Sequence, residues 1–166
     1  MHGYDRNLDA VFKVSSAIEA GLKVVLCIQE HERDTLCSED EPQDFLFAEL
    51  ERLSGQLSPE DWLNISIVYQ PYRFANLDND QEPQVVEERH KEIRDWIAKN
   101  VSQEVSYIVP IIYGGNNITA WNCKGYVSHK NVDGFLIDDS KRAMTNEFAQ
   151  IVAITGQSRS SDSEAI

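Results

Sequence analysis

Short, uninterrupted apolar runs rich in β-branched residues alternate along this chain with longer segments of helical periodicity. Strands that are covered on both faces, as in a parallel sheet, typically have such continuous apolar sequences. The runs that we predict as strands are residues 23–28, 65–69, 107–113 and 132–137. The alternation predicts an α/β fold with about four parallel strands and flanking helices.

The segments between these runs place apolar residues at helical spacing. We predict helices over residues 7–20, 42–53, 120–128 and 147–154, and a longer one that begins at Pro83. Proline is tolerated in a first helical turn because the N–H that it lacks would be unpaired there. The Ser-rich, polar tail over residues 156–166 is expected to be disordered, which leaves residues 1–155 as one domain.

Composition narrows the classes of partner. A length of 166 residues suits one domain, and a net charge of −13 argues against binding to nucleic acid or to an anionic membrane surface. Cys27, Cys37 and Cys123 have neither zinc-site nor disulfide-framework spacing, so no metal is expected. No apolar run follows the first residues, which favours a cytoplasmic protein without a signal peptide.

The predicted strands carry short sequences that resemble those of the triosephosphate isomerase family. They include Gly-Leu-Lys-Val-Val-Leu-Cys-Ile-Gln-Glu at 21–30, Val-Tyr-Gln-Pro at 68–71, Ile-Ile-Tyr-Gly-Gly at 111–115 and Val-Asp-Gly-Phe-Leu at 132–136. These matches occur in the family's order over most of the chain. The resemblance implies a partial (β/α)8 TIM barrel, made of the family's strands five to eight.

The resemblance also implies a chemistry to look for. The family interconverts dihydroxyacetone phosphate and glyceraldehyde 3-phosphate in glycolysis and gluconeogenesis without a cofactor, using a glutamate base, a neutral histidine and a closing loop. At the position of the catalytic glutamate this chain has Gln70, between Tyr69 and Pro71. A carboxamide has no useful basicity near neutral pH, whereas general-base catalysis contributes about 100- to 10,000-fold.

The phosphate-binding loops of the family have partial counterparts here. The resemblance assigns substrate binding to Gly114, Gly115 and Asn116, where backbone N–H groups would hold the phosphate. At the second glycine-rich loop the chain has Asp138 and Asp139, whose carboxylates would repel a phosphate dianion. The phosphate site is therefore expected to be impaired.

The lid and the histidine have no match. Residues 72–80 lack the family's glycine hinge, and no histidine lies in the family's histidine motif. We interpret His2, His31, His90 and His129 as surface residues. The sequence thus predicts a catalytically inactive family member with at most an interaction role.

Two alternatives remain open. In the first, the chain would be an active triosephosphate isomerase. In the second, it would cooperate with a separately encoded front half of the barrel. The runs at 23–28 and 132–137 would each lack one neighbouring strand in a half barrel. Unpaired apolar edges invite pairing with another chain, so self-association is expected.

Overall fold

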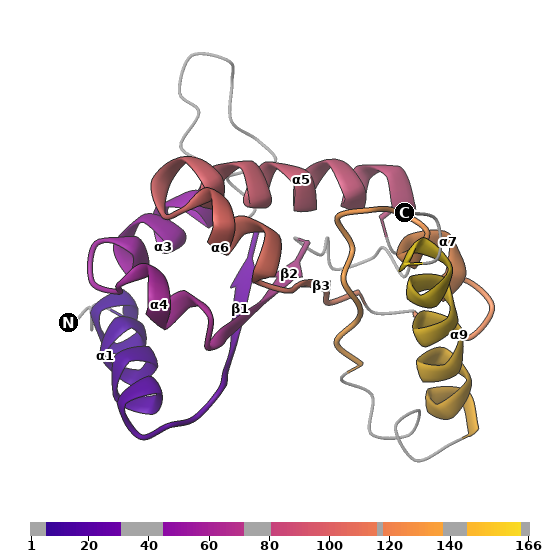
Figure 1. Ribbon diagram of the computed structural model, residues 1–166, viewed down its shortest axis with the longest axis horizontal. Helices are drawn as coiled ribbons and strands as arrows, with labels where there is room; N and C mark the ends of the chain where they lie inside the picture. The colour runs from indigo at the N-terminus through magenta and orange to yellow at the C-terminus, as the bar shows by residue number, and fades with distance from the viewer. Residues whose placement is uncertain (1–5, 31–44, 72–80, 116–117, 138–145, 164–166) are drawn as a thin grey trace, which may run out of the picture.

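A three-stranded parallel sheet lies at the centre of the protein (Figure 1). The computed structural model describes residues 6–30, 45–71, 81–115, 118–137 and 146–163. The strands are β1 (Val24–Gln29), β2 (Ile65–Gln70) and β3 (Ile111–Tyr113), in the order β1-β2-β3. Val24 is in register with Ile65, and Ile67 with Ile111. The expected α/β class and parallel strand direction are confirmed.

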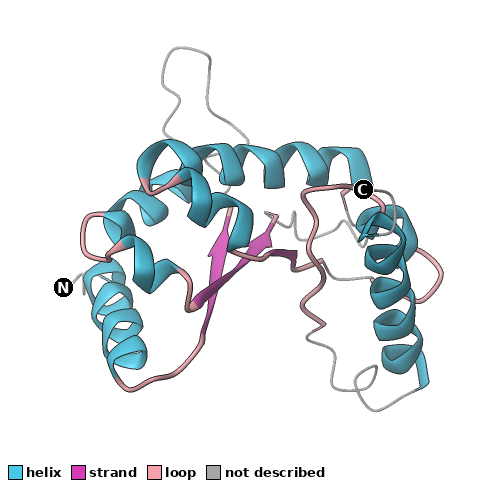
Figure 2. Cartoon of the chain, in the orientation of Figure 1, coloured by secondary structure: helices cyan, strands magenta, loops and turns pink. Residues whose placement is uncertain are grey.

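Helices surround the sheet on three sides of the view in Figure 2. They are α1 (Arg6–Glu19), α3 (Phe45–Ser54), α4 (Pro59–Trp62), α5 (Pro83–Asn100), α6 (Gln103–Ile108), α7 (Cys123–Val127) and α9 (Asn146–Ser163). Local sequence accounts for several ends. Gly21 follows α1 with a φ of 77°, and Pro83 occupies the first turn of α5. Ser58 and Asp61 form a reciprocal capping box on α4.

The third and fourth predicted strands are corrected by the structure. Residues 103–108 form α6, because the Ser102 hydroxyl accepts hydrogen bonds from the N–H groups of Glu104 and Val105 and so caps a helix. Strand β3 is consequently only three residues long.

The run at 132–137 forms no strand, although it lies beside β3. A single parallel bridge joins Tyr113 to Phe135, with backbone bonds of 2.9 Å from Tyr113 N to Gly134 O and from Leu136 N to Tyr113 O. The described residues therefore contain a three-stranded sheet and not a four-stranded one. The contact is too short to propagate a ladder.

The C-terminal segment also differs from expectation. Helix α9 continues to Ser163, whereas the sequence predicted an end near residue 154 and a disordered tail from Gly156. Extending a helix that has already nucleated fixes few new torsions per hydrogen bond, and serine is only a modestly poor helix former.

The hydrophobic core lies between the sheet and the helices. On the sheet it contains Ile28, Ile65, Ile67, Tyr69, Ile111 and Tyr113, and on α5 it contains Val86, Ile93 and Ile97. The side chains that alternate with the core residues point to the other side of the sheet. We call this side the open face. It comprises Val25, Cys27, Gln29, Ser66, Val68, Gln70, Ile112 and Gly114.

Exposure differs between these two sides along β1, although Val68 on the open face of β2 is fully buried. Val25 is 59% exposed and Cys27 is also exposed, while Ile28 on the core side is fully buried. Strands of parallel sheets are normally covered on both faces. None of the helices in the described part of the chain is long and apolar enough to cross a membrane.

Candidate functional site

The carboxyl ends of β2 and β3 bring together the site residues expected from the sequence. Gln70 is the last residue of β2, and Gly114 and Gly115 directly follow β3. The Gly114 N–H donates a 2.8 Å hydrogen bond to the carbonyl oxygen of Tyr69. Carboxyl ends of parallel strands are the usual location of active sites in this class of fold. Asn116 lies outside the described residues, as do 72–80, Asp138 and Asp139.

Gly114 is placed where a side chain would not fit. A Cβ atom on it would lie 2.8 Å from Gln70 Cγ, 3.0 Å from Val68 Cγ1 and 3.3 Å from the carbonyl oxygen of Tyr69. Such contacts are shorter than van der Waals packing allows. Glycine is therefore required here by the packing of β2 against β3, independently of any phosphate.

We expect Gly114→Ala to lower the free energy of unfolding by about 1–3 kcal/mol, because the new methyl group must displace Gln70 and Val68. Urea denaturation followed by circular dichroism measures this loss. The control is Gly156→Ala in α9, where a Cβ meets no atom within 4 Å and alanine improves helix propensity. A Gly114→Ala protein as stable as the parent would show that the strands have room to separate.

A buried carboxylate, which no local sequence pattern indicates, lies behind these strand ends. Glu30, which follows β1, is 9% exposed. Its Oε1 accepts hydrogen bonds from the Tyr69 hydroxyl at 2.7 Å and from Arg89 Nε at 3.1 Å. Burial, reinforced by the Glu30 charge, raises the pKa of Tyr69 above its ordinary value. The phenol therefore stays protonated and serves as a donor to Glu30.

Two further tyrosines fix the residue that leads into α5. The Tyr113 hydroxyl accepts a hydrogen bond from the Gln81 N–H at 3.3 Å, and the Tyr126 hydroxyl donates to the Gln81 carbonyl oxygen at 2.8 Å. The rings of Tyr113 and Tyr126 are stacked with centroids 5.3 Å apart. The backbone at Gln81 is thus held from both β3 and α7.

His90 contradicts the expectation of a surface histidine. It is fully buried, and its Nδ1 lies 3.2 Å from the carbonyl oxygen of Asn131, while its Nε2 has no hydrogen-bond partner. Its ring meets the Tyr69 ring edge-on, with centroids 5.6 Å apart. Burial lowers its pKa to about 4, so it is neutral at neutral pH.

The helical spacing of the sequence could have revealed this burial. His90 lies four residues after Val86 and three before Ile93, which puts it on the apolar stripe of α5. The polarity of the side chain hid that signal. His129 is half-buried in the loop after α7, and His2 and His31 lie outside the described residues.

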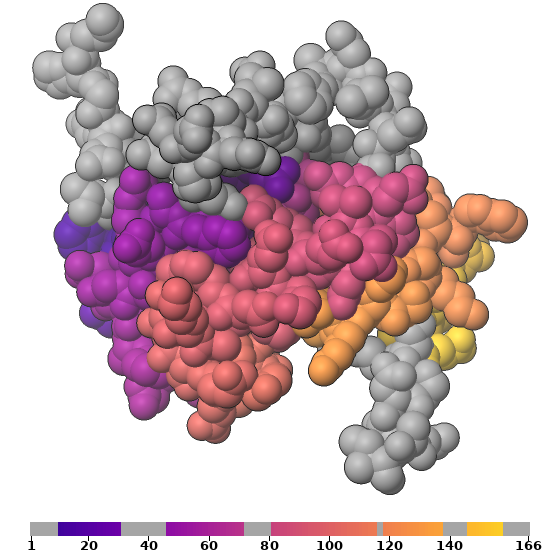
Figure 3. All heavy atoms as spheres, turned by 90° about the horizontal axis from the view of Figure 1, so that it is seen from above, coloured from indigo at the N-terminus to yellow at the C-terminus, as the bar shows by residue number. Residues whose placement is uncertain are grey.

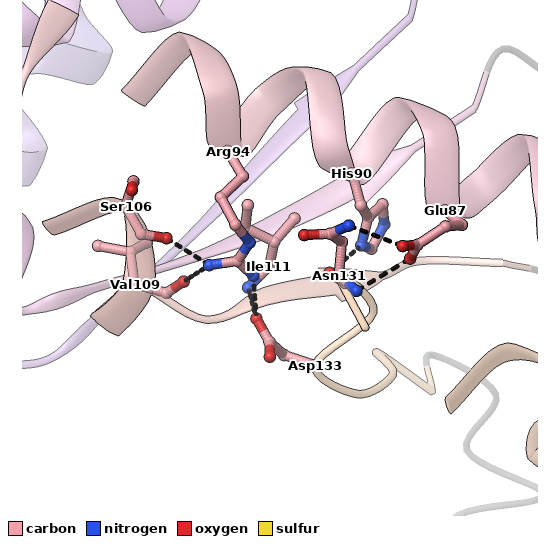
Figure 4. A network of polar contacts seen from close by, with 8 residues as sticks. All are labelled: Glu87, His90, Arg94, Ser106, Val109, Ile111, Asn131 and Asp133. Carbon is pink, nitrogen blue, oxygen red and sulfur yellow. Dashed lines mark hydrogen bonds and ion pairs between the residues drawn. The ribbon is translucent and has the colours of Figure 1, made fainter. Parts of the chain in front are cut away.

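Polar contacts on α5 tie this helix to the segment before residue 134 (Figure 4). The Glu87 carboxylate accepts hydrogen bonds from Asn131 N at 2.9 Å and Asn131 Nδ2 at 2.7 Å. Arg94 Nη2 lies 2.7 Å from Asp133 Oδ2, which also accepts from the N–H of Ile111 at 2.7 Å.

Arg94 completes the network by donating to backbone carbonyls. Its Nη1 bonds the carbonyl oxygens of Ser106 and, at 3.4 Å, Val109. Because Ile111 begins β3, the network lies at the amino ends of the strands, opposite Gln70. Residues at that end of such folds support stability.

A polar groove of about 490 Å³ runs beside this network. It is lined by α5, α6 and residues 130–133, and it includes Glu87, Arg94 and Asp133. These three side chains are already bonded to other groups of the protein. The groove is therefore a by-product of the network that joins α5 to residues 131–133, and we do not assign it a ligand. Among the described residues, no group of three or more His, Cys, Asp or Glu side chains is placed to hold a metal ion.

The described residues at the carboxyl ends of the strands present few ionisable side chains on the open face. On the open face, Gln70 is the polar residue next to the two glycines, and this face as defined above carries no carboxylate and no histidine. Glu30 is the carboxylate that directly follows a neighbouring strand. It bonds Tyr69 and Arg89 on the helix side of the sheet.

Comparison with known proteins accounts for this arrangement. Residues 4–155 match the family model described as triosephosphate isomerase. The chain is 33% identical over 134 residues to the triosephosphate isomerase of Entamoeba histolytica, covering 81% of this chain and 50% of that protein. It is 32% identical over 142 residues to the cytosolic triosephosphate isomerase of Oryza sativa subsp. japonica, covering 84% and 53%.

A third relative agrees. The triosephosphate isomerase of Taenia solium is 36% identical over 129 residues, which cover 75% of this chain and 49% of that protein. The chain spans about half the length of the curated relatives it matches. With a match that runs through nearly all of its elements, from α1 into α9, the chain belongs to the triosephosphate isomerase family.

Proposed function

We propose that this chain is a catalytically inactive member of its family, with a retained role in protein interaction at most. The observation that carries the proposal is Gln70 at the carboxyl end of β2, where the resemblance expects the catalytic glutamate. A neutral carboxamide cannot remove a proton from a substrate carbon at neutral pH.

Among the residues that the structure describes around Gln70, neither Glu30 nor His90 is placed to replace the missing base. Glu30 already bonds Tyr69 and Arg89, and it lies on the helix side of the sheet whereas Gln70 lies on the open face. His90 is buried in the core, where its ring contacts Tyr69 and Tyr113. It therefore does not lie on the open face, where an electrophile would meet a substrate. Both groups have structural partners instead of a substrate-facing position.

The test is a coupled assay for conversion of glyceraldehyde 3-phosphate by the purified chain. We expect a rate equal to that of a heat-inactivated sample, with an active triosephosphate isomerase as the positive control. Gln70→Glu restores the carboxylate but neither the histidine nor the second glycine-rich loop, so it too is expected to be inactive. Measurable turnover by the parent chain, or full recovery in Gln70→Glu, would contradict the proposal.

The second candidate is an active isomerase, alone or together with a front half supplied by another polypeptide. Membership of an isomerase family favours it. Mixing the chain with a fragment that contains the first four strands of an active relative would test the shared form. We expect no activity from the mixture, because Gln70 stays in place.

The name of one relative indicates a cellular compartment. The Oryza sativa protein is named as a cytosolic isomerase, and we propose the same compartment for this chain. Fractionation of cells that express a tagged chain tests this assignment, and recovery with membranes or organelles would contradict it.

A further inference from the structure

Gln81 lies two residues before α5 and is held by tyrosines from three different elements. Its N–H donates to the hydroxyl of Tyr113, on β3, at 3.3 Å, and its carbonyl oxygen accepts from the hydroxyl of Tyr126, on α7, at 2.8 Å. Its side-chain Oε1 lies 3.1 Å from the hydroxyl oxygen of Tyr69, on β2. Both backbone groups and the side chain of this one residue are therefore engaged.

The Tyr69 contact connects Gln81 to the buried carboxylate behind the strand ends. The Tyr69 hydroxyl donates to Glu30 Oε1 at 2.7 Å, and Arg89 Nε, on α5, bonds the same oxygen atom at 3.1 Å. One chain of polar contacts thus runs from α5 and the end of β1, through Tyr69 and Gln81, to α7.

Tyr126 is held by its ring as well as by its hydroxyl. The residue is only 4% exposed. Its ring stacks on that of Tyr113, with centroids 5.3 Å apart, and meets the Phe135 ring edge-on at 6.0 Å. Because the ring is packed on two sides, its hydroxyl separates from the Gln81 carbonyl only when Gln81 or α7 itself moves.

Helix α7 lies between this contact and the carboxyl-terminal helix. It packs against α5 and against α9, and in the space-filling view its orange atoms adjoin the pink atoms of α5 (Figure 3). A Cβ atom on Gly125 would lie 3.6 Å from Pro83 Cγ, so α7 covers the first turn of α5. A movement of the backbone that leads into α5 is therefore felt at α7.

We infer that Gln81 and the hydroxyls of Tyr69, Tyr113 and Tyr126 form a latch between the carboxyl ends of the strands and the helices α7 and α9. A shift of the Gln81 backbone takes its carbonyl oxygen away from a buried donor on α7, which lowers the stability of the docked helix. Coupling requires an element with two arrangements that both ends bias. Docked and undocked α7 are these two arrangements.

The latch acts through Gln81 and the three tyrosines and not through the Gln70 side chain. It therefore holds whether or not the chain is catalytically inactive. Amide exchange reports the latch and turnover reports catalysis, so the failure of one proposal leaves the other standing.

Hydrogen–deuterium exchange of the full chain tests the latch. Tyr126→Phe keeps the packed ring and removes the hydroxyl that donates to Gln81. We expect amide exchange to become about three- to tenfold faster over residues 119–129 and 146–154, as for the loss of one hydrogen bond. The control is Tyr107→Phe on α6, because that side chain is 69% exposed. It should change neither segment, and unchanged exchange in Tyr126→Phe would overturn the inference.

A second variant acts on the latch from the sheet side. Gln81→Ala removes the contact with Tyr69 but keeps the backbone groups that meet Tyr113 and Tyr126. Exchange in α7 should accelerate although α7 itself is unchanged, and the double variant Gln81→Ala/Tyr126→Phe should fall short of the product of the two single effects. Effects that multiply, or parental exchange of α7 in Gln81→Ala, would show that the two ends move independently.

Discussion

Asp133→Ala is expected to lower the free energy of unfolding by about 3 kcal/mol. The Asp133 carboxylate lies 2.7 Å from Arg94 Nη2 and also accepts the N–H of Ile111 at 2.7 Å. The Arg94 and Asp133 side chains are only 14% and 16% exposed. Removing the acid leaves a mostly buried guanidinium without its counter-charge and an N–H without its acceptor. Urea denaturation followed by tryptophan fluorescence measures the loss.

Two variants separate the charge from the hydrogen bond and from the general effect of losing an acid. Asp133→Asn keeps an acceptor for the Ile111 N–H, so it should lose less stability than Asp133→Ala. Asp95→Ala removes an acid from an ion pair with Lys91 in which both side chains are more than 60% exposed. It should barely move the transition. If Asp133→Ala unfolded at the same urea concentration as Asp95→Ala, this network would have no stabilising role.

The second large effect is a loss of stability in mild acid that comes from His90. Its pKa is lowered from 6.5 to about 4, first by burial, with Arg94 contributing, while the Asn131 carbonyl, Asp133 and Glu87 oppose the shift. The unfolded chain therefore takes up a proton below pH 6.5 that the folded chain refuses until about pH 4. Stability from this source is complete above pH 6.5 and falls by about 3 kcal/mol as the pH drops to 4.

His90→Gln isolates this contribution, because glutamine keeps an N–H donor for the Asn131 carbonyl but does not titrate in this range. The free energy of unfolding, measured by denaturation at several pH values, should fall less steeply between pH 6.5 and 4 in His90→Gln than in the parent. His129→Gln, which removes the half-buried loop histidine, is the control. Parallel profiles for the parent and His90→Gln would mean that His90 is protonated in the folded protein.

The α/β class, β1, β2 and α5 could be predicted because their periodicity is set by local burial. Strand β3 was extended too far, since Tyr107 and Ile108 have the apolar, aromatic composition of a strand but belong to a helix capped by Ser102. The apolar sequence of residues 132–137 predicts a full strand, but only Phe135 forms a bridge. Pairing depends on the neighbouring strand as well as on the segment's own sequence.

The site was predictable only in part. Gln70 and Gly114 do lie together, because parallel strands bring their carboxyl ends to one edge of the sheet. Glu30, Tyr69 and Arg89 were missed because their contacts join residues 39 and 59 positions apart, which no local pattern encodes. His90 was misread because a polar residue type was given more weight than its position on the helix.

The contacts of α5 have a consequence for synthesis of the chain. His90 is 41 residues from Asn131, and Arg94 is 39 residues from Asp133. A ribosome releases the amino-terminal side first, so α5 is complete well before either partner has emerged. During that interval Arg94 and Glu87 must remain hydrated, and the helix cannot dock fully against the sheet. Nascent chains that end before Asn131 are therefore the stage at which chaperones would find this protein most exposed.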